Sequence, residues 1–336
     1  MKMTRLDLSF AITPYDRVQP LLSGEVRLEG IRLRYFDLNA PDVFVRQIKW
    51  SQFDVSEMSF SSFLRARSQG WPYRALPVFH NRNFSYTRIL IRRSSGIRPN
   101  HPEDLKGKHV GIADYQQTAG LWQRGVLEHE FGVAPGDMEW FQERPPELSH
   151  TGTTGFDVPA GVKFHYTDTD LGTMFLRGDL DAAFTYITGT AIDRDKADLS
   201  RNPDYCLLFD DPRAESCRYY QKEGVFPPHH LTVVRESILQ EHPWVSLDLM
   251  NAFEKAKKLA MDRLRVRTPS LLIFSREDLE QQRSVFGDDP FAYGVKANAK
   301  AIDMVQTFSV EQGFTPKKQP LDELFPREIL TYEGRL

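Results

Sequence analysis

The strand and helix pattern of this chain is interrupted twice, which limits the folds that the chain can adopt. The stretches "LDLSFAI" (6–12), "IRLRYFDL" (31–38) and "FDVSEMSF" (53–60) have strand patterns, with the helical pattern "APDVFVRQIKW" between the last two. A new series of strands and helices begins after a Pro-rich stretch near residue 97. "FPPHHLTVVR" (226–235) then has the pattern of a strand that rejoins the first series. The chain therefore passes twice between two units.

This pattern predicts an α/β protein with two lobes and a ligand cleft between them. We expect residues 1–90 and 225–336, including the C-terminal helices, to form the first lobe, and residues 91–224 to form an inserted second lobe. A length of 336 residues fits two domains of ordinary size. The segment 141–160 is rich in Pro, Gly and Thr, and we expect it to be a mobile loop.

Composition and motif content exclude several classes of partner. The net charge is -3 and the basic residues are scattered, which argues against binding to nucleic acid or an anionic membrane. The sequence shows neither a signal peptide pattern nor a long apolar run, so we expect a cytoplasmic protein. It lacks metal-ligand and nucleotide-binding spacings, so no metal or cofactor is expected. A small molecule is the expected partner, and a homo-oligomer stays open.

Polar residues follow the predicted strands of both lobes. Glu57 and Ser59 lie at the end of one strand, where a carboxylate would act in acid-base chemistry or pair with an arginine. In "DYQQTAG", Gln116, Gln117 and Thr118 lie at a helix start, whose free N–H groups and dipole suit a carboxylate. The alternative is that Thr118 only caps its helix.

The two crossings carry further candidates. "FHNRNFSY" places His80, Arg82 and Tyr86 at the first crossing, where an arginine can hold a carboxylate through paired hydrogen bonds. The alternative is a polar edge strand. His229 and His230 lie at the second crossing, and strand pleating predicts that only one of them faces a ligand. A histidine on a strand can also be purely structural.

Several stretches in order and spacing resemble the 4,5-dihydroxyphthalate decarboxylase family. They include "PYDRV", "DVSEMSFSSF", "PVFHNRNF", "GVFPPHHLTVVR" and "YGVKANAKAIDMVQTF", and the likeness spans nearly the whole chain. The family is related to the type II periplasmic solute-binding proteins, which implies the same two-lobed fold. The chain departs from the family pattern at Tyr86, where a histidine is usual, and at "TYITGTA" (185–191), which contains Tyr186.

The resemblance implies cofactor-independent decarboxylation of a hydroxylated aromatic carboxylate by general acid-base catalysis, as in phthalate catabolism. The residues expected to act in catalysis are His230, Glu57 and His80, and which of His230 and Glu57 is the acid stays open. The residues expected to bind substrate are Asp16, Arg17, Ser59, Arg82, Tyr86, Tyr115, Gln116, Gln117, Thr118, Tyr186 and His229. Of the adjacent pair, His230 occupies the place of the family's histidine.

Two other functions fit the same sequence. A solute-binding or sensor protein could capture an aromatic carboxylate without chemistry, because the fold serves both purposes. Release of CO₂ from hydroxylated phthalates would distinguish the enzyme from the binding protein. A lyase for another aromatic acid is the third reading, since the two departures fall on residues expected to line the cleft.

Overall fold

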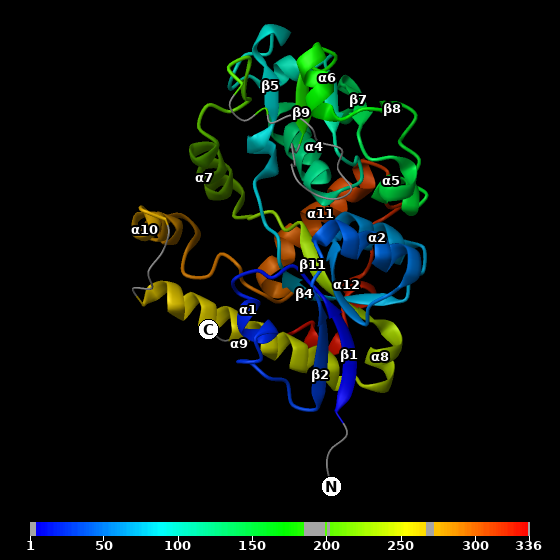
Figure 1. Ribbon diagram of the computed structural model, residues 1–336, viewed down its shortest axis with the longest axis vertical. Helices are drawn as coiled ribbons and strands as arrows, with labels where there is room; N and C mark the ends of the chain where they lie inside the picture. The colour runs from blue at the N-terminus through cyan, green and yellow to red at the C-terminus, as the bar shows by residue number, and fades with distance from the viewer. Residues whose placement is uncertain (1–4, 185–198, 200–201, 267–271, 335–336) are drawn as a thin grey trace.

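A computed structural model describes residues 5–184, 199, 202–266 and 272–334, and two mixed sheets organise these residues (Figure 1). The first sheet has the strand order β2-β1-β3-β11-β4 and the second has the order β10-β5-β9-β6-β7-β8. The strands of the first sheet are β1 (Leu6–Ala11), β2 (Ile31–Phe36), β3 (Val55–Ser59), β4 (Tyr73–Phe79) and β11 (His230–Arg235). Those of the second are β5 (Leu90–Arg92), β6 (His109–Ile112), β7 (Glu139–Gln142), β8 (Lys163–Tyr166), β9 (Ala182–Phe184) and β10 (Tyr205–Leu207).

The first sheet is completed by a strand from the far end of the sequence. β1 pairs in parallel with β2 and β3, whereas β11 is antiparallel to both β3 and β4. One face packs against the long helix α9 (Trp244–Arg265), with Phe10 and Phe253 at a ring-centroid distance of 6.2 Å. The other helices near this sheet are α1 (Gln19–Leu22), α2 (Ala40–Trp50), α3 (Phe60–Ser68) and α8 (Glu236–Glu241).

Between residues 109 and 223, the sequence pattern predicts some helices and misses others. α4 (Thr118–Phe131) begins where the sequence predicts a helix start, and α6 (Leu171–Arg177) ends at Gly178, whose φ of 82° suits glycine. The segment 141–160, expected to be a loop, instead contains a 3₁₀ turn and the short helix α5 (His150–Thr153). The sequence pattern did not predict α7 (Pro212–Glu223).

The two segments that are predicted to cross between the lobes run side by side. The backbone N–H of His229 donates to the carbonyl of Asn81 at 2.7 Å, and Arg82 and Pro228 form an antiparallel bridge. After Asn83 the first of these segments forms a 3₁₀ turn at Ser85–Arg88, before β5. The predicted crossings therefore meet next to the start of β11.

The C-terminal segment contacts helices that precede both crossings and helices that lie between them. It contains α10 (Ser275–Phe286), α11 (Ala299–Glu311) and α12 (Leu321–Leu324). α11 packs on α3 and on α4, and Arg124 of α4 donates to Gln312 at 2.8 Å. The lobe boundaries near residues 90 and 225 stay a prediction. Among the described residues, no helix combines the length and apolarity that crossing a membrane requires.

The contact between α4 and α11 depends on a glycine. A Cβ atom added at Gly125 would lie 2.3 Å from a ring carbon of Phe308. We expect Gly125→Ala to lower the free energy of unfolding by about 1–3 kcal/mol through overpacking, as measured by urea denaturation. Gly161→Ala is the control, because a Cβ atom there meets nothing within 4 Å. Equal stability of the two variants would contradict the tight packing.

Candidate active site

A carboxylate and an imidazole form the centre of the candidate site on the first sheet. Glu57 on β3 lies opposite Thr232 on β11, and Ser59 lies opposite His230. Glu57 and His230 are therefore diagonal neighbours on the same face of the sheet. His230 Nδ1 lies 2.6 Å from Glu57 Oε1. An ionised carboxylate only accepts hydrogen bonds, so Nδ1 carries the hydrogen and Nε2 is the nitrogen that can exchange a proton.

The Glu57 carboxylate is buried and fully engaged. Its side chain is 0% exposed, Oε1 also accepts the Tyr15 hydroxyl at 2.6 Å, and Oε2 accepts the backbone N–H of Thr13 at 2.9 Å. Burial alone would raise the pKa of Glu57. The hydrogen bond from His230, the electrostatic interactions with His230 and His80, and the Tyr15 hydrogen bond outweigh burial and lower this pKa to about 2. The carboxylate is therefore ionised at neutral pH.

His80 contacts two neighbours of the Glu57 and His230 pair, Thr232 and Tyr15. Its Nε2 is 2.6 Å from Thr232 Oγ1, and its ring stacks on Tyr15 with the centroids 5.7 Å apart. The pairing of β4 and β11 shifts register between Leu231 and Thr232 next to this contact. Burial lowers the pKa of His80 to about 3. The three residues predicted for catalysis thus come together, but His80 and Glu57 are buried and only His230 is partly exposed.

The starts of α3 and α4 meet beside His230. Thr118 Oγ1 is 2.9 Å from Ser59 Oγ and accepts the backbone N–H of Ser61 at 3.0 Å. Thr118 therefore bridges to α3, and no side-chain hydrogen bond caps α4. The buried Gln116 accepts the Thr154 hydroxyl at 2.6 Å, while its Nε2 has no hydrogen-bond partner among the described residues. Two helix N-termini and an amide donor thus gather at this point.

A second histidine, not predicted from the sequence, lies near His230. His150 Nδ1 is 2.8 Å from Ser62 Oγ, and the backbone N–H of His150 donates to Asp114 at 2.6 Å. The ring of Phe44 makes edge contacts with His230 and His150, at centroid distances of 4.8 and 5.6 Å. The sequence signal was weak because His150 lies in the segment expected to be a loop. The aspartate that ends the strand "KHVGIAD" was the available clue.

Three predicted binding residues have partners other than the Glu57 and His230 pair. Arg82 donates to the carbonyl of Phe226 at 2.8 Å and to the Asn298 side chain at 2.5 Å. The Tyr86 hydroxyl donates to Glu215 at 2.8 Å. The Tyr115 ring lies in the core, 3.8 Å from the guanidinium carbon of Arg124. Each of these side chains is engaged by partners distant in sequence, and their role in holding substrate stays a prediction.

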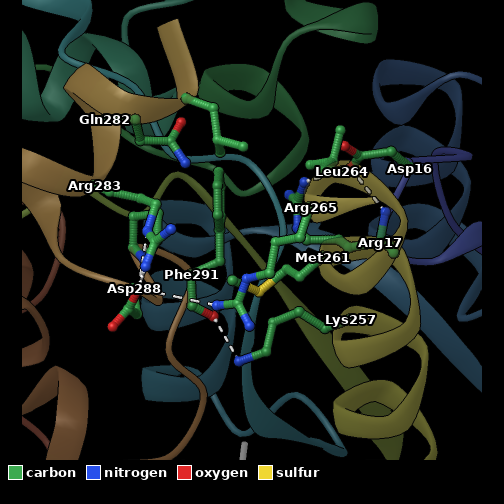
Figure 2. A pocket seen from close by; sticks show the side chains of 13 residues that line it. Asp16, Arg17, Lys257, Met261, Leu264, Arg265, Gln282, Arg283, Asp288 and Phe291 are labelled. Carbon is green, nitrogen blue, oxygen red and sulfur yellow. Dashed lines mark hydrogen bonds and ion pairs between the residues drawn. The ribbon is translucent and has the colours of Figure 1, made fainter. Parts of the chain in front are cut away.

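Asp16 and Arg17 line a pocket whose lining does not include Glu57, His230 or His150 (Figure 2). Arg17 donates to the carbonyl of His80 and lies over the Phe291 ring, 4.3 Å from its centroid. Asp16 pairs with Arg17 at 3.3 Å, and the pocket is otherwise lined mainly by side chains of α9, α10 and the segment up to Phe291. Arg17 thus contacts the backbone of His80, and Asp16 contacts Arg17. Neither of these contacts involves His230.

The remaining predicted residues divide into three cases. His229 is buried, and burial lowers its pKa to about 3, whereas His230 is the histidine of the pair that bonds Glu57. Gln117 is the residue before α4 and lies next to the Thr118 bridge. Tyr186 falls outside the described residues. In the described part of the chain, no group of three or more His, Cys, Asp or Glu side chains could hold a metal ion.

The contacts of Arg82 predict that its replacement affects stability more than substrate binding. Arg82→Met leaves the Phe226 carbonyl and Asn298 without their donor, so we expect the free energy of unfolding to fall by about 1–3 kcal/mol. Substrate KM should change little. Thermal and urea denaturation together with steady-state kinetics measure both effects, with the exposed Arg88→Met as the control. An increased KM at unchanged stability would return Arg82 to the binding residues.

Comparison with known proteins identifies the family. No family model matches the chain. A 4,5-dihydroxyphthalate decarboxylase from Comamonas testosteroni is 30% identical over 337 residues, covering 98% of this chain and 100% of that protein. This chain belongs to the 4,5-dihydroxyphthalate decarboxylase family. A Pseudomonas putida protein of the same name is 31% identical over 223 residues, covering 65% of this chain and 83% of that protein. As a member of this decarboxylase family, the chain is a carboxy-lyase.

Solved structures confirm the predicted fold class of this family member. The periplasmic aliphatic sulphonate binding protein SsuA from Escherichia coli has a TM-score of 0.53 at 12% identity, covering 98% of this chain and 94% of its own. The desulfurization enzyme DSZB has a TM-score of 0.51 at 14% identity, covering 97% and 98%. At these identities the likeness establishes the fold alone. The decarboxylase therefore has a periplasmic-binding-protein-like fold.

Proposed function

We propose that this decarboxylase removes CO₂ from a hydroxylated aromatic dicarboxylate such as 4,5-dihydroxyphthalate, without a cofactor. The observation that carries the proposal is the pair of Glu57 and His230, with 2.6 Å between Oε1 and Nδ1. An imidazole held by a buried carboxylate is oriented for proton transfer at its other nitrogen. The names of the two relatives supply the substrate class.

The proposed reaction exchanges one carboxylate for one proton. His230, in the form that carries a hydrogen on both ring nitrogens, donates its Nε2 proton to the ring carbon that bears the leaving carboxylate, and the hydroxyl opposite that carbon loses its proton. The ring is then no longer aromatic, and the C–C bond to the carboxylate breaks. Its electron pair returns to the ring as CO₂ leaves, and the oxygen regains a proton. Solvent returns a proton to Nε2 after the reaction. The product of 4,5-dihydroxyphthalate is 3,4-dihydroxybenzoate.

The geometry revises the roles expected for Glu57 and Arg82. Both Glu57 oxygens are engaged, so Glu57 orients His230 and does not itself contact the substrate. Arg82 is replaced as the carboxylate ligand by the amino end of α4 at Gln117 and Thr118, with the Gln116 amide beside it. Ser59 belongs to the same group of proposed binding residues, because its hydroxyl contacts that of Thr118.

Product analysis tests the proposal directly. Incubation of the protein with 4,5-dihydroxyphthalate should release CO₂ and 3,4-dihydroxybenzoate in equal amounts, measured by gas analysis and chromatography. In D₂O, the product should carry one deuterium at the vacated carbon. Phthalate without hydroxyl groups should not react, because it lacks the oxygen that supplies electrons. Saturable binding without CO₂ release would favour the solute-binding alternative, and release only from another phenolic acid would change the substrate. Cytoplasmic location and homo-oligomer formation stay predictions.

A further inference from the structure

The proposed reaction needs a proton acceptor that the Glu57 and His230 pair does not supply. Glu57 is engaged on both oxygens, so the pair offers a single exchangeable nitrogen, His230 Nε2. Protonation of the ring carbon and loss of the phenolic proton occur at opposite ends of the ring. The structure should therefore contain a second polar group near His230 that remains without a protein partner.

His150 has these properties. The residue is 2% exposed, and among the described residues its Nε2 has no hydrogen-bond partner. Its orientation is fixed by the 2.8 Å contact from Nδ1 to Ser62 and by the backbone hydrogen bond to Asp114. A buried nitrogen that is held in place without a partner costs free energy unless a ligand supplies the partner.

His150 lies in a helix and His230 in a strand, but both imidazoles contact the same ring. His150 begins α5, which follows β7, whereas His230 begins β11. The Phe44 ring lies edge-on to both imidazoles, with interplanar angles of 72° and 85°. Phe44 is therefore a shared apolar neighbour of both imidazoles, which is the kind of surface that a flat aromatic ring packs against. We propose that His150 Nε2 binds the phenolic hydroxyl opposite the leaving carboxylate and accepts its proton while His230 protonates the ring carbon. This inference rests on the proposed function and names the group that recognises the hydroxyl.

The surroundings separate the two histidines chemically. Burial lowers the pKa of His150 to about 4; the Asp114 charge opposes this, and Arg144 and His230 add to it. His150 is therefore neutral at pH 7, whereas His230 is paired with the ionised Glu57. A weak base is sufficient here because the hydroxyl becomes strongly acidic once the ring carbon is protonated. Environments that differ in this way are typical of acid and base partners.

The histidine has two amide mimics that separate its two nitrogens. An asparagine amide reaches the position of Nδ1 and can keep the Ser62 hydrogen bond, but it leaves the Nε2 position empty. A glutamine amide reaches the Nε2 position. We expect His150→Asn to lower kcat on the order of 10²-fold. His150→Gln should retain substrate binding while it also loses turnover, because an amide does not accept the proton.

Binding measurements separate hydroxyl recognition from a structural role. In the His230→Gln background, in which turnover is expected to be slow, calorimetry gives Kd for 4,5-dihydroxyphthalate and for phthalate. We expect His150→Asn to weaken binding of the dihydroxy compound about tenfold and to leave phthalate binding unchanged. His129→Asn, on the exposed face of α4, is the control and should change neither value.

The outcomes distinguish this inference from the proposed function. If the unmodified protein releases no CO₂, the proposed function fails. If it releases CO₂ while His150→Asn keeps full activity and full preference for the dihydroxy ligand, only the assignment of His150 fails. Equal weakening for both ligands indicates a structural role and also overturns the assignment. Should His150→Asn not fold, as judged by circular dichroism, unchanged kcat in His150→Gln would overturn it in the same way.

Discussion

Replacing His230 with Gln is expected to lower kcat by about 10²- to 10⁴-fold, with little change in KM. The glutamine amide can still accept or donate one hydrogen bond near Glu57, so the buried carboxylate keeps a partner. It does not transfer a proton to a ring carbon at neutral pH. The loss should therefore appear in the chemical step, measured as initial rates of CO₂ release at saturating substrate.

The position of His230 on the sheet makes this a sharp test. His230 lies opposite Ser59 at the end of β3, and its side chain is 17% exposed, whereas the Glu57 side chain is 0% exposed. His101→Gln serves as the control for a general loss of histidine, because the His101 side chain is 45% exposed. If His230→Gln keeps wild-type kcat, His230 is not the proton donor and the proposed site is wrong.

The second large effect is expected for Glu57→Gln. Three donors converge on the carboxylate: the Thr13 N–H, the Tyr15 hydroxyl and His230 Nδ1–H. An amide offers one oxygen, so its NH₂ group must face one of these donors. Either a buried donor loses its acceptor or the His230 proton moves to the other nitrogen. We expect kcat to fall on the order of 10²-fold and the free energy of unfolding to fall by about 1–3 kcal/mol.

The Glu57 carboxylate also sets a pH dependence of stability. Its pKa is lowered from 4.5 to about 2, so the folded protein binds the proton less tightly than the unfolded chain does. The stabilisation, about 3 kcal/mol by linkage, is fully present above about pH 4.5 and is lost as the pH falls towards 2. We expect the difference in stability between wild type and Glu57→Gln to shrink over this range.

Denaturation at a series of pH values measures this difference. Glu241→Gln is a suitable control, because that side chain is 80% exposed and pairs only at 3.9 Å. A constant difference between wild type and Glu57→Gln from pH 6 to 2.5 would contradict an ionised, stabilising carboxylate at this position. An increase of the difference on acidification would contradict it as well.

The sequence predicted those parts of the fold and site that depend on local pattern. Alternation located the strand that carries Glu57 and the strand that begins at His230, and the residues of "DYQQTAG" located the start of α4. The pleat argument predicted that only one of His229 and His230 faces a ligand, and the family resemblance pointed to His230. These inferences hold because side-chain direction along a strand is fixed by its period of two.

Residues whose role depends on distant partners were not predictable. Arg82 is held by Asn298, 216 positions away, and nothing in "FHNRNFSY" indicates that partner. His150 acquires its surroundings from Ser62, 88 positions earlier, and from Phe44 of α2. The sequence pointed to Asp16 and Arg17 as binding residues, but their neighbour Tyr15 is the residue that bonds Glu57. Tertiary packing decided these contacts.

The place of β11 between β3 and β4 has a consequence for how the enzyme comes into being. The first sheet stays split into two parts until residues 230–235 have left the ribosome, although its other strands are complete by residue 79. Pairings this distant in sequence form late and slowly. The edges of β3 and β4 therefore stay unpaired in the nascent chain until β11 is inserted between them. Only then do Glu57 and His230 come together.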